Sequence, residues 1–140
     1  MDLKQVKTVE QLAALMKTMD MVTSVPWTDY SDTSTIVGFS AYSVKLIRYR
    51  KVGKLVFVVF SIHGTSDLVT TTFTLPFSNT TNPPINLVIH AEDDSVWSWG
   101  RINVLASSAT VSCYYGPGSG NTWTASGTKA VRGEFFFETA

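Results

Sequence analysis

Residues 54–62 (KLVFVVFSI) form the most apolar stretch of the chain, and glycines at 53 and 64 bracket it. β-Branched and aromatic residues dominate the stretch, which is typical of a strand. Successive strand side chains point to opposite faces, yet both faces are apolar here. We predict a central strand that needs cover on both faces, by an opposing sheet on one and by further protein, such as another copy of the chain, on the other. One face of this strand would carry the row Leu55, Phe57, Val59 and Ser61, and the opposite face the row Val56, Val58, Phe60 and Ile62.

Residues 3–21 predict a single helix. Thr8 and Gln11 have the spacing of a capping box, and Asp2 is an equally good start signal. Apolar residues recur at spacings of three and four along this segment, which indicates a stripe that cannot remain uncovered in water. The stripe either packs on the chain's own β domain or pairs with copies of itself as a short coiled coil, and we favour pairing. The candidate oligomerisation residues are Val9, Leu12, Met16 and Met19.

Beyond Pro26, short apolar segments alternate with turn signals to the end of the chain. Residues 28–39 predict an irregular linker or a weak edge strand, and residues 40–50 a strand that forms a hairpin with the central strand through Gly53. Further strands are expected at 70–77, 85–90, 96–105, 109–115 and 130–138. This spacing predicts a mainly β fold, an antiparallel β-sandwich of jelly-roll type with one N-terminal α-helix.

The charge of the chain is balanced, with 11 Lys and Arg residues against 11 Asp and Glu residues, so we expect no nucleic-acid partner. No segment approaches the roughly 20 apolar residues of a membrane span, and the N-terminus lacks a signal-peptide core, so we expect no membrane insertion. The single cysteine, Cys113, cannot form an intrachain disulfide and is expected to be a packed, unreactive thiol.

Few residues point to catalysis. His63 and His90 are expected to end strands as exposed or structurally bonded side chains. The chain contains no Gly-x-Ser-x-Gly motif and no spacing of Cys and His that suits zinc. The carboxylates at 92–94 fit a solvated hairpin tip better than a calcium loop. We therefore predict a protein that is not an enzyme and that has no catalytic residue, no cofactor and no metal site.

Aromatic side chains offer binding chemistry. Trp97 and Trp99 lie two apart on a predicted strand and so face the same way. Such rings stack on sugars and also serve protein contacts at a small entropic cost. The competing interpretation places this pair in the core or in a subunit interface, and we favour it for the pair; for Trp123 the two interpretations are equal. The candidate ligand-binding residues are Trp97, Trp99, Tyr114, Tyr115 and Trp123.

Four segments, residues 49–56, 64–66, 72–77 and 126–135, carry a hairpin, a turn, an edge strand and a last strand in a recognisable order. In this order the chain resembles the small β-sandwich head domains of bacteriophage tail-fibre, receptor-binding and head-fibre (decoration) proteins. The resemblance spans about residues 27–139. It implies a homotrimer with an N-terminal helical stalk, residues 1–25, and a β-sandwich head, residues 26–140.

The resemblance further implies a virion protein made in the host cytoplasm, which contacts other virion proteins and binds a host surface polysaccharide or protein. Fibres usually carry a longer attachment region than this helix. A capsid decoration protein without a receptor role therefore stays open, as does a monomeric carbohydrate-binding module. Receptor-binding loops of such heads share no motif that can be matched here, so no binding residue is transferred.

Overall fold

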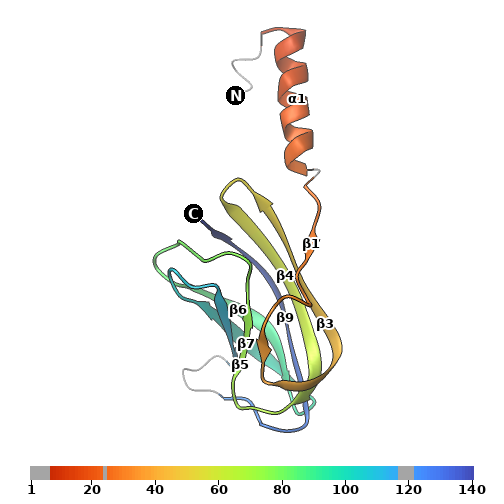
Figure 1. Cartoon of the computed structure of the whole chain (residues 1–140), viewed down its shortest axis with the longest axis vertical. Coiled ribbons are helices and arrows are strands. Elements are labelled where there is room, and N and C mark those ends of the chain that lie inside the picture. Colours follow the sequence, from red (N-terminus) through yellow and green to blue (C-terminus); the bar gives the residue numbers. More distant parts are fainter. Residues whose placement is uncertain (1–6, 24, 117–121) are drawn as a thin grey trace.

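The computed structural model describes residues 7–23, 25–116 and 122–140. In these residues a helix, α1 (Val9–Thr23), precedes one antiparallel sheet in the order β1-β3-β4-β9-β6-β7-β8-β5-β2. Figure 1 shows α1 standing away from the curled sheet. The strands are β1 (Thr28–Asp29), β2 (Ile36–Val37), β3 (Phe39–Val52), β4 (Leu55–Ser66), β5 (Thr71–Thr74), β6 (Ile85–Asp93), β7 (Val96–Val104), β8 (Thr110–Tyr115) and β9 (Thr128–Glu138).

The segment from β1 to β2 ties the two edges of the curled sheet together. β1 pairs with β3 at one edge, and β2 pairs with β5 at the other. Between them the Ser34 hydroxyl donates to the Thr74 carbonyl over 2.8 Å, and the Thr74 N–H donates to the Thr35 carbonyl over 3.1 Å. The mainly β, antiparallel prediction is confirmed, and the segment predicted as a linker or weak edge strand joins both edges.

β4 lies between β3 and β9, as predicted for the central strand. One of its rows, Val56, Val58, Phe60 and Ile62, is fully buried in the core. The other row receives part of its cover from its own chain. Phe57 lies 6.0 Å from the Phe136 ring, and the Arg50 guanidinium lies 5.7 Å from the Phe57 ring.

The helix begins at Val9 with the predicted capping box. The Gln11 N–H donates to the Thr8 hydroxyl over 3.1 Å, and the Thr8 N–H donates to the Gln11 side-chain carbonyl over 3.3 Å. Residues 3–6 of the predicted helix lie outside the described residues. Val9, Leu12 and Met16, on the apolar stripe of α1, are 43–80% exposed, so the described residues of the head do not cover this stripe. In the described residues no helix is long and apolar enough to cross a membrane.

A lysine is buried where three parts of the chain meet. The Lys129 ammonium donates to the carbonyls of Gly38 and Leu68 over 3.0 and 2.8 Å, and it lies 5.3 Å from the rings of Phe39 and Trp123. Burial lowers the pKa of Lys129 to about 8, because the charged form loses hydration. This side chain links β9, the junction of β2 with β3, and the loop after β4.

Lys129 makes the stability of the head depend on pH in the alkaline range. The folded protein holds the Lys129 pKa near 8, below the ordinary 10.5, so the folded state resists protonation of this group. Below pH 8 the folded state bears the cost of holding a charged, buried ammonium. This cost disappears as the pH rises toward 10.5, so the free energy of unfolding should rise by about 2 to 3 kcal/mol across that range. Chemical denaturation at a series of pH values measures this rise.

The control for this prediction is Lys129→Met, which fills the same space without a titrating group. Its unfolding free energy should be lower overall, because two buried carbonyls lose their donor, and the rise attributed to Lys129 should be absent. An equal rise in both proteins would contradict the assignment.

Candidate functional site

The strand β7 presents two tryptophans on the outer side of the sheet. Gly100, Ile102 and Val104 point into the core, so the alternating residues of β7 point outward. Trp97 is 44% exposed and Trp99 is 70% exposed. The pair faces one way, as its spacing predicts, and it does not lie in the core.

Side chains from three neighbouring strands hold the ring of Trp97. The imidazole of His90 on β6 stacks on the indole, with ring centroids 4.2 Å apart and planes 19° apart. The guanidinium of Arg132 on β9 lies 4.9 Å from the indole. Arg132 also donates through Nη2 to Nε2 of His63 on β4, over 3.0 Å. The Arg132 side chain is thereby fixed on one side by His63 and on the other by Trp97.

We call His90, Trp97, Trp99 and Arg132 the tryptophan platform. A shallow hollow of about 330 Å³ lies on it, lined by His90, Trp97, Ser98 and Trp99. The platform combines flat aromatic faces with guanidinium and imidazole nitrogens. Such a surface can stack on the apolar face of a sugar ring and donate hydrogen bonds to its hydroxyls.

The two histidines are placed differently from the prediction. His63 and His90 lie within β4 and β6, not at strand ends, because β4 continues to Ser66 and β6 continues to Asp93. Burial lowers the pKa of His63, and the neighbouring Arg132 lowers it further. Since Arg132 can only donate, Nε2 of His63 must be the acceptor, which requires a neutral imidazole.

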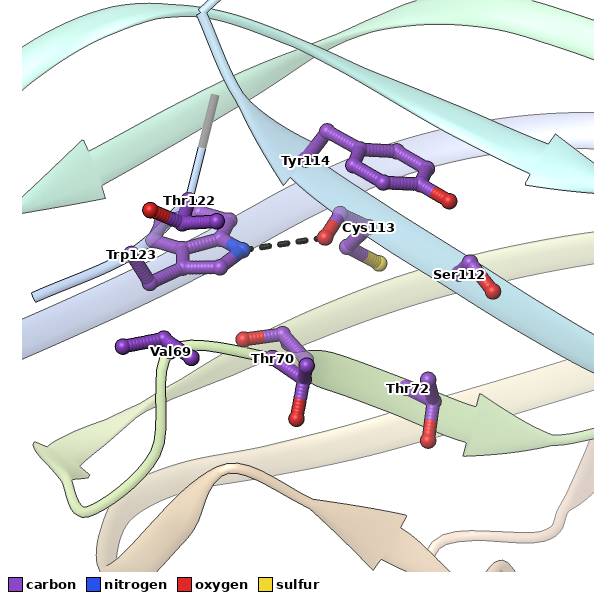
Figure 2. A pocket seen from close by; sticks show the side chains of 9 residues that line it. Val69, Thr70, Thr72, Ser112, Cys113, Tyr114, Thr122 and Trp123 are labelled. Atoms are coloured by element: carbon purple, nitrogen blue, oxygen red, sulfur yellow. Dashed lines mark hydrogen bonds between the residues drawn. The ribbon is translucent and has the colours of Figure 1, made fainter. Parts of the chain in front are cut away.

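The other predicted ligand residues separate into two groups. Tyr114 lies on the outer side of β8, where the Arg101 guanidinium stacks 4.4 Å from its ring. Trp123 is only 2% exposed, and Figure 2 shows its indole N–H directed at the carbonyl of Cys113, to which it donates over 2.9 Å. Tyr115 packs 5.4 Å from Trp123, and its hydroxyl donates to the carbonyl of Val96 over 3.0 Å. The platform therefore does not include Tyr115 or Trp123.

The sequence interpretation missed His90 and Arg132 as members of the platform. His90 could have been found, because a two-residue turn at Asp94 and Ser95 places it opposite Trp99 across the hairpin. Arg132 gives no such local signal, since β9 meets β6 from far along the chain.

The remaining sequence predictions for chemistry concern the carboxylates at 92–94 and the cysteine. Asp94 and Ser95 form the tip of the hairpin between β6 and β7, and Asp93 accepts from the N–H and hydroxyl of Thr124. Cys113 is buried, as predicted for a packed thiol, and burial raises the pKa of its thiol to about 12. Within the described residues no three metal-ligating side chains gather.

Comparisons with protein families and with curated proteins gave no match. A comparison with solved structures found the crystal structure of the head domain of phage bIL170, described in connection with a common fold for the receptor-binding domains of lactococcal phages. The sequence identity is 14% and the TM-score is 0.42, over 84% of this chain and 100% of that chain. A TM-score of this size carries no functional argument, so the function rests on the residues of the surface.

The contact between His63 and Arg132 should respond to mild acid. The His63 pKa is lowered in the folded protein, so the stabilising contribution of the neutral ring is present above pH 6.5 and is lost as the pH falls below it. Protonation removes the acceptor of Arg132 and places two cations together. We expect the fluorescence of Trp97 and the thermal stability to change between pH 7 and pH 5.

The variant His63→Gln tests this contact, because its amide oxygen accepts from Arg132 without titrating in this range. The acid-induced change in emission should be smaller in this variant than in the unchanged protein. An acid response of the same size in this variant would show that His63 is not the responsible group.

Proposed function

We propose that this chain is a virion attachment protein whose β head binds a glycan of the host surface through the tryptophan platform. The observation that carries the proposal is the pair of exposed indoles, Trp97 and Trp99, beside the fixed guanidinium of Arg132. Exposed large aromatic rings in one patch are unusual on a soluble surface and typical of binding sites. The virion setting is supported by the segments that resemble bacteriophage head domains.

A glycan suits the platform better than an apolar partner does. Arg132 and His90 place nitrogen donors around the indole of Trp97. A sugar ring offers an apolar face for the indole and hydroxyls for these donors, so it satisfies both kinds of group at once. A purely apolar partner would leave the guanidinium without an acceptor on its open side.

Binding also suits the platform better than catalysis does. The carboxylates nearest to it are Glu92, opposite Trp97, its neighbour Asp93, and Glu134, which lies two residues beyond Arg132 on β9. Glu92 accepts from the hydroxyl of Thr128 over 3.1 Å, and Asp93 accepts from Thr124. These bonds hold the hairpin tip against the start of β9 and the segment before it, so Glu92 and Asp93 have structural partners. Of these three, Glu134 alone is then left beside the platform, whereas glycoside hydrolysis uses a pair of carboxyl groups. We therefore propose a binding protein that is not an enzyme.

We further propose that the head, residues 26–140, is a homotrimer joined through the helical segment, residues 1–25. The stripe of α1 is exposed, and a helix of 15 residues is too short to be stable alone in water. Pairing of three stripes would cover the apolar side chains. A decoration protein without a receptor role would share this assembly but bind no glycan, and a carbohydrate-binding module would bind as a monomer.

Removal of an exposed indole should weaken glycan binding. We expect Trp99→Ala to reduce the affinity for the best-binding member of a printed array of bacterial surface polysaccharide fragments by about tenfold, which equals about 1.4 kcal/mol. Phe136→Ala is the matched control, because Phe136 is also an exposed aromatic on the outer side of the sheet and lies outside the platform. Equal affinities for Trp99→Ala and the unchanged protein would refute the assignment of the site.

Charges in the helix stripe should separate the subunits. Light scattering on a sizing column should give a trimer for the unchanged chain and a smaller species for the double variant Leu12→Asp, Met16→Asp, because the buried carboxylates lack partners. Ala14→Asp is the control, since Ala14 is exposed on the side of α1 opposite the stripe. A monomeric unchanged chain would favour the carbohydrate-binding module, and an unchanged trimer in the double variant would show that the helix does not hold the assembly.

A further inference from the structure

The tryptophan platform is the first of three hollows on the outer side of the sheet. A second hollow, of about 190 Å³, lies beside Trp99 and is walled by Asn86, Val88 and Arg101. A third, of about 140 Å³, lies where β8 meets β5. The first and second hollows lie one after the other along β6 and β7, and the third lies across the sheet from them, because the strand order is β6-β7-β8-β5.

The third hollow is mainly apolar, with Val69, Cys113 and Trp123 in its lining, and hydroxyl-bearing side chains lie among these residues. Figure 2 shows Thr70 and Thr72 from the β5 side and Ser112 and Tyr114 on β8, with Trp123 at one end. Thr72 lies opposite Ser112 in the register of β5 and β8. In the described part of the chain the hydroxyls of Thr70, Thr72, Ser112 and Tyr114 have no hydrogen-bond partner. Hydroxyls of this kind can bond the hydroxyls of a polyol ligand.

Arg101 joins the second hollow to the third. It lies opposite Tyr114 in the register of β7 and β8, and its guanidinium stacks on that ring. Its Nε is buried and has no hydrogen-bond partner in the described residues. A ligand cannot reach this buried nitrogen, so the donors that Arg101 offers to a ligand are the terminal nitrogens of its guanidinium.

We propose that the ligand of this surface is an oligosaccharide chain of at least three units that crosses the strands from the tryptophan platform, past Arg101, to the hydroxyls of Thr72, Ser112 and Tyr114 between β8 and β5. This inference rests on the proposed glycan-binding function and adds the length and direction of the bound chain. Neighbouring strands lie about 4.8 Å apart, so the path from β6 to β5 covers about 14 Å. A single sugar ring cannot contact both ends of such a path.

The division of roles along the path follows from the side chains. Trp97 and Trp99 supply stacking at one end, and Arg101 supplies donors in the middle. Thr72 and Tyr114 supply hydroxyls at the far end. Short fragments should therefore occupy the platform alone, and only longer fragments should gain from the far hollow.

The test uses the best-binding polysaccharide of the printed array as a ladder of fragments from one to six units. Calorimetry of the full chain should show an affinity that rises at least tenfold between one unit and three or four units and then levels off. The variant Thr72→Val, Tyr114→Phe removes two far-end hydroxyls and keeps the shapes of the side chains. It should bind one-unit and two-unit fragments as the unchanged protein does and lose about tenfold for the longer fragments.

Two results separate failure of this inference from failure of the proposed function. If Trp99→Ala abolishes binding while the double variant binds every fragment normally, the glycan site stands and the extended path is refuted. The same conclusion follows if affinity is equal for one and six units. If no fragment on the array binds, the glycan-binding function and the extended path both fail.

Discussion

The alternation of buried and outward residues along β4 is the constraint on which the rest of the structure depends. Its inward row, Val56, Val58, Phe60 and Ile62, is fully buried, and β3 and β9 pair along nearly its whole length. A shift of the register by one residue would exchange the two faces, so the core fixes the register. Each strand that joins this sheet must then point every second side chain outward.

The tryptophan platform is a consequence of that constraint. Gly100 and Ile102 are committed to the core, so Trp97 and Trp99 project outward from the same strand. The register of β6, β7 and β9 then brings His90 and Arg132 against Trp97. Because these groups lie on paired strands, they are held in place by the sheet, so the glycan binding proposed for them would lose little conformational entropy.

Local patterns allowed much of the fold to be predicted. The β3–β4 hairpin, the capping box of Thr8 and Gln11, and the shared direction of the two exposed tryptophans follow from near neighbours in the sequence. The structure of the segment from β1 to β2 could be predicted less well. These two strands have only two residues each, and they form because they pair with strands that are distant in the sequence. The contact of Arg132 with Trp97, and the burial of Lys129 and Trp123, depend on pairings far apart along the chain and leave no local signal.

The most direct measurement is ¹⁹F NMR of the chain with fluorotryptophan at its four tryptophans, titrated with the best-binding polysaccharide of the array. The tryptophans report on separate places: Trp27 at the base of the helix, Trp97 and Trp99 on the platform, and Trp123 in the core. If the platform is the glycan site, the Trp97 and Trp99 signals should shift strongly and the Trp27 signal should stay. Unchanged Trp97 and Trp99 signals at saturating polysaccharide would contradict it.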